Sequence, residues 1–375
     1  MQAVVRWVGV GICLAISLSF VVPLVAAWSL LPDFTMFWAA ARFALTEPHK
    51  VYDIASMGAA QAWAIAPSKG PRPFPYPPTA LLLIAPFGLL PFWAAYWSWT
   101  VLSIAAFWSA VRRVASRWAV PLAIAMPHSV LVLILGQTTL FAGSAVIWAI
   151  SLLNKRPALA GILFGVVAAL KPQSVLLAPL VFIRVRDWRP AIGAAASFGG
   201  LCLVSLLFGA GLWRSWFETL SSHPQMVSFY HLEIIGATPR MAGMGLHLDQ
   251  SAITAAQYVG IIAGMAILWF GFGSSDKLLR VQCFVIGCLL ASPYAMRYEV
   301  AVLAPVLATA ILKAEPRSIL VSLPAYAFNA PAVVASFVVS SVTSLVDQRQ
   351  SRKLESRGSE SSVAGGASQH PLSSI

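Results

Sequence analysis

The sequence predicts an all-α, polytopic integral membrane protein, and three observations carry this prediction. Its residues are 59% hydrophobic and 10% charged, whereas soluble proteins average about 25% charged residues. Seven segments contain no Asp, Glu, Lys or Arg, and most approach the roughly 20 apolar residues that a membrane helix needs. Short basic clusters lie between them, which is typical of cytoplasmic loops.

The charge-free segments are the predicted crossings. The first follows a single basic residue, Arg6, and is long for the apolar core of a signal peptide. We therefore expect an uncleaved first helix. In chain order the segments are residues 7–31, 91–111, 118–135, 138–153, 190–212, 251–273 and 318–346.

The basic clusters set the predicted orientation, because Lys and Arg concentrate in short cytoplasmic loops. The clusters and the N-terminus are placed inside, and the two long connections, residues 32–78 and 213–250, outside. The net charge of +12 thus reflects membrane topology and contact with membrane lipids rather than a nucleic-acid partner. The clusters are Arg112, Arg113 and Arg117; Lys155 and Arg156; Arg184, Arg186 and Arg189; Lys277 and Arg280; Lys313 and Arg317.

Two further apolar stretches, residues 158–183 and 281–312, lie between cytoplasmic clusters yet carry polar groups at their centres. Each is predicted to be a re-entrant hairpin of two short, broken helices. Proline causes the breaks, because it removes a helix N–H and clashes with the preceding turn. The breaks are expected at Lys171-Pro172 and at Ser292-Pro293.

The C-terminal region leaves one alternative open. Asn329 and Pro331 could divide the last segment into a third hairpin, which would keep the basic tail inside. We expect about nine to eleven membrane segments, all in a domain of residues 1–346. Residues 347–375 are rich in Ser, Gly and charge, which predicts a disordered tail.

The first outer connection holds the main candidate for catalysis. Apolar residues at helical spacing predict an interfacial helix on the outer face, beginning at Asp33. Asp33 could cap this helix. It could also act as general base on a substrate hydroxyl at the mouth of a cavity. The apolar positions are Phe34, Phe37, Trp38, Ala41 and Leu45.

Lys171 and Arg297 are cations within the apolar hairpins, where an unpaired charge is costly. One interpretation is structural pairing, of Arg297 with Glu299 or of Lys171 with a helix carbonyl. The other is binding of an anionic headgroup such as a lipid phosphate. In the proline-rich segment 71–78, Tyr76 could stack on a sugar or lie in the aromatic belt.

The sequence lacks the motifs typical of metal binding, nucleotide binding and serine-nucleophile catalysis. The four cysteines form no C-x-x-C pair, and the histidines of the second outer connection lack metal-binding spacing. No Walker A sequence, G-x-G-x-x-G, G-x-S-x-G or D-x-D pair occurs. We therefore expect neither a metal nor a cofactor.

An ordered set of short motifs runs from about residue 30 to about residue 310. They are residues 33–42 (DFTMFWAAAR), Val51-Tyr52-Asp53, Phe74 to Pro78 with Leu89-Leu90-Pro91, Gly136-Gln137, Gly161 through Leu170-Lys171-Pro172, and Ser292-Pro293-Tyr294 before Tyr298-Glu299. Each is weak alone, whereas their order is fairly specific. Together they resemble glycosyltransferase family 87.

The resemblance implies a GT-C-type glycosyltransferase in a bacterial-type plasma membrane. Such an enzyme transfers a hexose, often mannose, from a polyprenyl-phosphate carrier to a lipid or glycan acceptor on the outer face, with inversion and without a metal. Asp33 matches the proposed catalytic carboxylate, and Lys171 and Arg297 would bind the donor phosphate. Similar sequences commonly carry an acidic or other polar residue in place of Arg297, which favours Lys171. Candidate substrate-binding residues are Arg42, Tyr52, Asp53, Tyr76, Gln137 and Glu299.

Two other function classes compete with this interpretation. A secondary transporter or lipid flippase also builds its site from paired, proline-broken helices. An ion-coupled carrier should carry acidic residues within its spans, however, and only Glu299 comes close. A scaffold subunit of an envelope-polysaccharide system would not need Asp33.

Overall fold

The described part of the chain is helical. The computed structural model describes residues 2–26, 32–65, 71–221, 236–313, 334–335 and 337–350. Within these ranges α-helices and short 3-10 helices make up the regular structure, and the extended pairing consists of one isolated antiparallel bridge between Gly236 and Met296. The predicted all-α class is confirmed.

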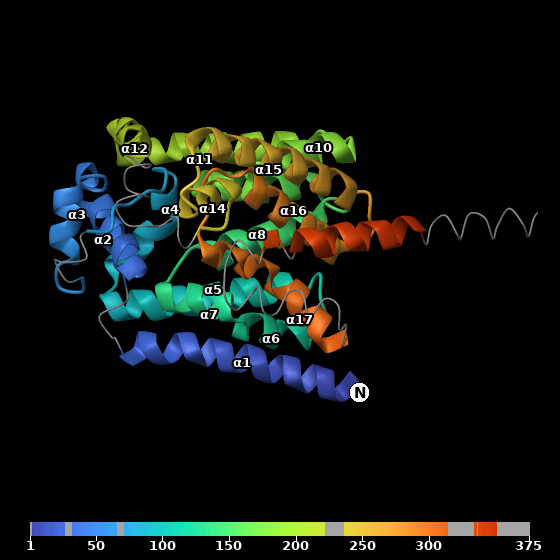
Figure 1. The fold of residues 1–375 in the computed structure, drawn as a ribbon. Coiled ribbons are helices and arrows are strands. Elements are labelled where there is room, and N and C mark those ends of the chain that lie inside the picture. The colour runs from blue at the N-terminus through green and yellow to red at the C-terminus, as the bar shows by residue number, and fades with distance from the viewer. Residues whose placement is uncertain are drawn as a thin grey trace, which may run out of the picture.

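The longer helices form an elongated bundle with their axes roughly side by side (Figure 1). α1 (Gln2–Ala26) lies along one side of the bundle, and α11 (Arg189–Ser205) and α15 (Gln250–Gly271) lie along the other. α5 (Phe92–Val111) and α8 (Thr139–Leu152) pack against each other between them. The α5 and α15 bounds agree within two residues with crossings predicted from the sequence.

Two helical segments of the described chain are long and apolar enough to cross a membrane. They are Arg189–Phe208, with a mean hydropathy of 2.0, and α15, with a mean hydropathy of 1.7. Only 11% and 28% of their most apolar windows are buried inside the protein. Large apolar side chains such as Ile192, Leu203 and Ile262 therefore face outward, an arrangement that suits contact with lipid.

Helix α9 (Pro157–Leu170) packs closely against α11 through glycines. A Cβ on Gly161 would lie 2.0 Å from the Pro190 carbonyl oxygen, and a Cβ on Gly193 would lie 2.3 Å from that of Ala158. Such close backbone approach requires small residues and is common between membrane helices. α9 is therefore held in a fixed position on α11.

The first predicted proline break occurs where expected. α9 ends at Leu170, and η4 (Pro172–Val175) leads into α10 (Ala178–Val185). Lys171 lies between them with φ −151° and ψ 72°, outside the helical region. The residue before a proline is disfavoured in the α conformation, which explains this geometry. Lys171 thus leaves the helix at the break.

The second predicted break is also present. α16 (Lys277–Ala291) ends before Ser292, and η7 (Arg297–Leu303) leads into α17 (Ala304–Lys313). Ser292 stabilises the turn, because its hydroxyl donates a 2.6 Å hydrogen bond to the Tyr294 carbonyl. Both hairpins therefore present irregular backbone near their centres.

One expected crossing is divided, and the prediction of a single helix over residues 118–135 is wrong. The segment contains α6 (Ala119–Ala125) and α7 (Pro127–Leu135), with Met126 between them at φ −62° and ψ 145°. Pro127 is the cause, since its ring disfavours a helical Met126 and it offers no N–H to α6. α7 packs beside α1.

The helices of the connection over residues 32–78 gather at one end of the bundle, away from the N-terminus (Figure 1). They are α2 (Pro32–Thr46) and α3 (Ile54–Gln61), and α12 (Gly211–Ser221) lies at the same end. The predicted helix after residue 32 is thus present. Its Phe34 and Phe37 are buried, because they pack into the end of the bundle.

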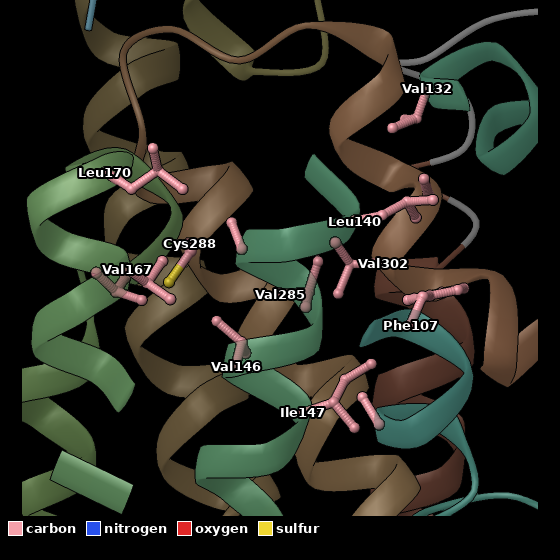
Figure 2. Packing of buried hydrophobic residues seen from close by; sticks show 14 of the residues in the cluster. Phe107, Val132, Leu140, Val146, Ile147, Val167, Leu170, Val285, Cys288 and Val302 are labelled. Atoms are coloured by element: carbon pink, nitrogen blue, oxygen red, sulfur yellow. The ribbon is translucent and has the colours of Figure 1, made fainter. Parts of the chain in front are cut away.

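A continuous apolar core lies between the helices of the bundle. Figure 2 shows side chains from α8, α9 and α16 converging at its centre. Val146, Val167 and Val285 are buried there, together with Cys288 and Val302. The core fixes the relative positions of the helices that carry the polar site described next.

Parts of several predictions lie outside the described residues. They include residues 27–31 of the first expected crossing, residues 66–70 and 222–235 of the two long connections, residues 314–333 with the possible break at Asn329 and Pro331, and the tail from residue 351 onward. Residues 337–350 are helical, so that helix extends past Val346, where the predicted domain ends.

Candidate active site

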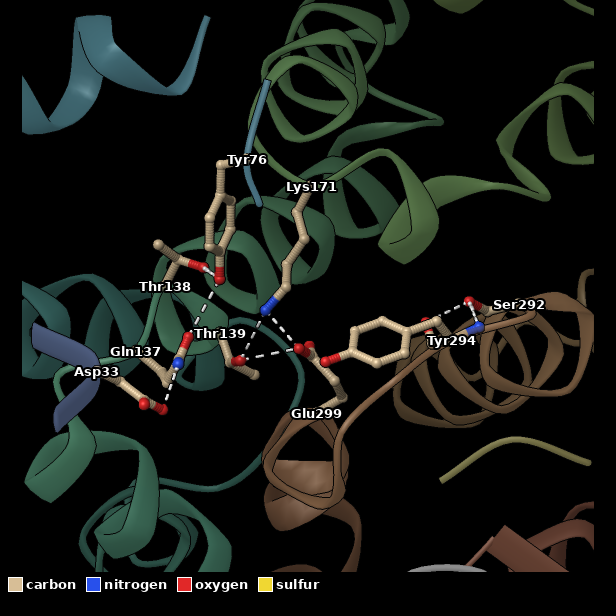
Figure 3. A network of polar contacts seen from close by, with 9 residues as sticks. All are labelled: Asp33, Tyr76, Gln137, Thr138, Thr139, Lys171, Ser292, Tyr294 and Glu299. Carbon is tan, nitrogen blue, oxygen red and sulfur yellow. Dashed lines mark hydrogen bonds and ion pairs between the residues drawn. The ribbon is translucent and has the colours of Figure 1, made fainter. Parts of the chain in front are cut away.

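A series of polar contacts begins at Asp33, in the first turn of α2. Its Oδ2 accepts a 2.7 Å hydrogen bond from Gln137 Nε2. The other end of the same amide, Oε1, accepts a 3.1 Å hydrogen bond from the Tyr76 hydroxyl, which lies 3.2 Å from Thr138 Oγ1. Gln137 therefore fixes the carboxylate relative to Tyr76 (Figure 3).

A buried ammonium group lies beside these contacts. Lys171 is 2% exposed, forms an ion pair with Glu299, and donates a 3.1 Å hydrogen bond to Thr139 Oγ1. Thr139 in turn donates to Glu299 Oε2 at 3.3 Å. Because Thr138 and Thr139 are adjacent at the start of α8, the two groups of contacts form one site (Figure 3).

Aromatic rings enclose the ammonium. Lys171 Nζ lies 5.9 Å from the ring centroid of Tyr76 and 5.5 Å from that of Tyr298. The negative faces of such rings attract a cation. Lys171 is therefore held charged by one carboxylate, one hydroxyl and two rings.

Gly136 brings Gln137 to Asp33. It ends α7 with φ +67°, a conformation that glycine adopts without strain. A Cβ at this position would lie 2.6 Å from the Phe34 Cβ. The glycine thus allows the end of α7 to lie directly against the first turn of α2, where Asp33 is located.

The proline-rich segment positions Tyr76 through hydrogen bonds to its backbone. The Tyr52 hydroxyl donates to the Tyr76 carbonyl at 2.7 Å, and Trp216 Nε1 donates to the Pro75 carbonyl at 3.1 Å. Phe37 packs against the Tyr76 ring, with centroids 5.1 Å apart. Tyr76 is buried by these contacts, so it belongs to the site rather than to an exposed aromatic belt.

Opposing effects act on the Asp33 carboxyl. Burial raises its pKa above the ordinary value, while the Gln137 hydrogen bond and the positive charges of Arg72 and Lys171 lower it, and the net shift is upward. Burial also raises the pKa of Tyr76, which keeps its hydroxyl protonated and able to donate. An Asp with a raised pKa is a stronger base than an exposed one once it is ionised.

Arg72 was not among the residues singled out from the sequence. Its backbone exchanges two hydrogen bonds with the Gln61 side chain, at 2.9 and 3.0 Å. This clamp holds the arginine where its charge acts on Asp33. Its position at the start of the proline-rich segment 71–78 is the sequence feature that could have identified Arg72 as a site residue.

Three other predicted site residues have different surroundings. Arg42 is exposed, with its guanidinium 5.0 Å from the Trp38 ring centroid. Asp53 is exposed and caps α3, accepting a 2.7 Å hydrogen bond from the Ser56 amide, which lowers the pKa of its carboxyl. Tyr52 acts through the Tyr76 backbone. The structure therefore does not bring Arg42 and Asp53 to the Asp33 network.

From the sequence, the structural alternative for Glu299 was an ion pair with Arg297. Glu299 pairs instead with Lys171, from the other hairpin. Arg297 and Glu299 both lie in η7, two positions apart, so their side chains leave the helix in different directions. Arg297 is half-buried at the start of η7.

The site residues that the sequence reasoning missed include Thr138 and Thr139. They follow directly on Gly136-Gln137, which was the signal that could have identified them. A small cavity of about 30 Å³ lies beside Thr139 and Glu299 and continues between apolar residues of α8 and α16. In the described ranges, no group of three or more His, Cys, Asp or Glu side chains is placed to hold a metal ion.

Comparison with known proteins gives two matches. The model of glycosyltransferase family 87 matches residues 74–293, more than half of the chain. A polyprenol-phosphate-mannose-dependent alpha-(1-2)-phosphatidylinositol pentamannoside mannosyltransferase from Mycolicibacterium smegmatis is 29% identical over 200 residues, which are 48% of this chain and 43% of that protein. The chain thus spans less than half the length of this relative. No solved structure matches.

Proposed function

The chain belongs to glycosyltransferase family 87, and on this premise we propose that it transfers a hexose from a polyprenyl-phosphate carrier to a hydroxyl of a lipid or glycan acceptor. Mannose is the first sugar to test, because the similar mannosyltransferase is named for its dependence on polyprenol-phosphate-mannose. The observation that supports this most is that two groups of polar contacts, one around Asp33 and one around the buried Lys171, adjoin at the neighbouring residues Thr138 and Thr139 (Figure 3).

Asp33 is the proposed general base. Its carboxylate would take the proton from the acceptor hydroxyl as that oxygen attacks the anomeric carbon, with inversion at that carbon. Gln137 orients the carboxylate through the 2.7 Å hydrogen bond. Its place in the first turn of α2 stabilises the ionised form, since a helix N-terminus favours negative charge.

Lys171 is the proposed ligand of the donor phosphate. As the bond from the sugar to the phosphate oxygen breaks, negative charge grows on the polyprenyl phosphate, and a fixed cation stabilises it. The ammonium carries three donors, of which Thr139 and Glu299 accept two. An arriving phosphate would share the ammonium with Glu299. Arg297, on the same hairpin as Glu299, is a second candidate for the phosphate.

The proposed setting is a bilayer crossed by the helix bundle, with a GT-C-like arrangement of about nine to eleven segments. α2, α3 and α12 would lie at the outer surface, and the basic loop residues would lie inside. Two features support this placement: the apolar outward face of Arg189–Phe208 and α15, and the location of α2 at the end of the bundle away from the N-terminus.

The test compares transfer of labelled mannose from polyprenyl-phosphate-mannose to a membrane lipid extract by the wild type and by Asp33→Asn, each purified and reconstituted in liposomes. We expect transfer to fall by about 10²- to 10⁴-fold in Asp33→Asn, the usual contribution of a general base. Asp53→Asn is the matched control, since Asp53 is an exposed helix cap in the same outer connection. It should retain transfer.

Each result has a defined meaning. Equal transfer by wild type and Asp33→Asn, with both folded, would show that Asp33 is structural. No transfer by the wild type from any polyprenyl-phosphate sugar would contradict the enzyme proposal and favour a transporter or scaffold.

A further inference from the structure

A large groove opens at the end of the bundle opposite the Asp33 network. It has a volume of about 1060 Å³ and lies between α1, α6 and α17. These three helices pack against one another beside the N-terminus (Figure 1). The groove is therefore separate from the proposed catalytic site.

Basic side chains line the rim of this groove. They are Arg6 from α1, Arg113 from the turn after α5, and Lys313 at the end of α17. One acidic residue, Asp276, also lines it, but its carboxylate accepts backbone hydrogen bonds as the N-cap of α16. The rim thus carries excess positive charge, which suits an anionic group.

The Trp148 ring holds the Arg113 guanidinium in place. Its guanidinium carbon lies 3.6 Å from the Trp148 ring centroid, and Trp148 is fixed by a 3.1 Å hydrogen bond from its Nε1 to the Ser109 hydroxyl. Stacking occupies the flat face of a guanidinium and leaves N–H groups at its edge for hydrogen bonds. A phosphate at the rim would meet an ordered donor.

Below the rim the groove is apolar. Val10 and Leu14 from α1 line it on one side, and Leu122 and Ala125 from α6 line it on the other. Leu14 follows Arg6 by two helical turns, which places it about 12 Å further along the axis. The groove therefore has a cationic rim above an apolar wall that an acyl chain could contact.

Two tryptophans line the groove near the rim. Trp7 is 71% exposed and Trp118 is 66% exposed. Tryptophan is enriched at the level of lipid headgroups, where its ring meets both apolar chains and water. Their position beside the basic residues marks this end of the groove as the headgroup level.

We propose that the groove binds an anionic phospholipid, with the phosphate at Arg6, Arg113 and Lys313 and an acyl chain along α1 and α6. Basic pockets between membrane helices recognise anionic headgroups in this way. The inference rests on the membrane placement proposed above and is independent of the transfer reaction.

Native mass spectrometry of the delipidated full chain tests this, with phosphatidylglycerol and phosphatidylcholine of identical acyl chains as probes. We expect the wild type to retain phosphatidylglycerol on the order of tenfold more strongly, and Arg6→Gln/Lys313→Gln to lose this preference. The matched control is Lys155→Gln/Arg156→Gln, which removes two exposed basic residues from another loop. It should behave as the wild type.

A second variant separates charge from shape. Ala125→Phe keeps every charge and places a phenyl ring in the apolar part of the groove. It should weaken retention of both lipids, while the preference for phosphatidylglycerol persists. Equal retention of the two lipids by the wild type, or the same loss in the Lys155/Arg156 control, would overturn the proposal. Because no sugar donor is present in these measurements, their outcome does not depend on whether the chain is a transferase.

Discussion

Two aspartates of the connection over residues 32–78 show how surroundings decide the role of a residue. Asp53 is exposed and accepts a backbone hydrogen bond at the start of α3, which lowers the pKa of its carboxyl. Asp33 is hydrogen-bonded to the Gln137 side chain, from the distant connection between α7 and α8, and burial raises the pKa of the Asp33 carboxyl. Only the second arrangement directs a basic carboxylate toward a site.

The pH dependence of transfer should depend on Gln137. A general base works when ionised, so kcat/KM should rise with pH as Asp33 loses its proton. The Gln137 hydrogen bond lowers the pKa of Asp33. Gln137→Leu removes it, which raises that pKa, so the rise in kcat/KM should move to higher pH. Profiles of both proteins over pH measure this, and an unmoved profile would mean that another group controls the rise.

The Lys171–Glu299 pair should be structurally and chemically important at once. Lys171→Met leaves Glu299 buried without its cation, which typically costs about 3–5 kcal/mol. Lys171→Met/Glu299→Met removes both charges and should recover much of this stability, because no uncompensated charge remains. Thermal unfolding in detergent measures the stability of both variants.

Transfer activity separates the two roles of Lys171. If Lys171 binds the donor phosphate, the double variant should be stable yet inactive. A stable double variant with normal transfer would reduce the ion pair to a structural role.

At the scale of elements, the polar site is assembled where helices stop. α7 ends before Gly136, α9 ends before Lys171, and α16 ends before Ser292. Each stop is caused by a glycine or proline, which frees a residue from helical geometry. Two residues at these stops enter the site directly: Gln137 bonds Asp33, and Lys171 pairs with Glu299, which lies in η7 after the third stop.

Gly136→Ala should disturb both folding and catalysis. The alanine would have to adopt φ +67°, and its Cβ would lie 2.6 Å from the Phe34 Cβ. We therefore expect a loss of about 1–3 kcal/mol in the free energy of unfolding. Transfer should fall as well, because Gln137 moves relative to Asp33. Gly199→Ala is the control: it lies within α11 with open space around it. Equal stability losses in the two variants would contradict this account.

At the scale of the whole molecule, the bundle separates two kinds of surface. The Asp33 network lies at the end that carries α2 and α3, and the basic groove lies at the end that carries the N-terminus (Figure 1). In a membrane this separation would direct transfer chemistry to one face and anionic lipid to the other. This assignment of faces rests on the positions of the Lys and Arg residues, which the positive-inside rule places on the cytoplasmic side.

Cysteine labelling tests the placement of the two ends. His49 follows α2 and Arg156 follows α8, and both are exposed. We expect His49→Cys to react with a membrane-impermeant thiol reagent in intact cells and Arg156→Cys to react only after permeabilisation. The parent chain measures background from the four native cysteines, of which Cys202 is half-buried and the others are buried. The reverse pattern would invert the proposed orientation.

The sequence by itself determined the helical class, the bounds of helices such as α5 and α15, both hairpin breaks and the family. These features depend on local properties: the length of apolar runs, the missing N–H of proline and the order of motifs. The divided segment 118–135 was equally local, since Pro127 marks the break. The absence of Asp, Glu, Lys and Arg over these residues predicted one crossing, but the proline divides it.

Only the tertiary structure decided which polar residues meet. Glu299 pairs with Lys171, 128 positions away, rather than with Arg297 beside it, and Asp33 bonds Gln137 across 104 positions. The basic groove likewise needs α1, α6 and α17 together. The physical reason is that such contacts depend on how helices pack and cross, which is set by close approach at glycines and by the whole apolar core. Spacing along the chain does not contain that information.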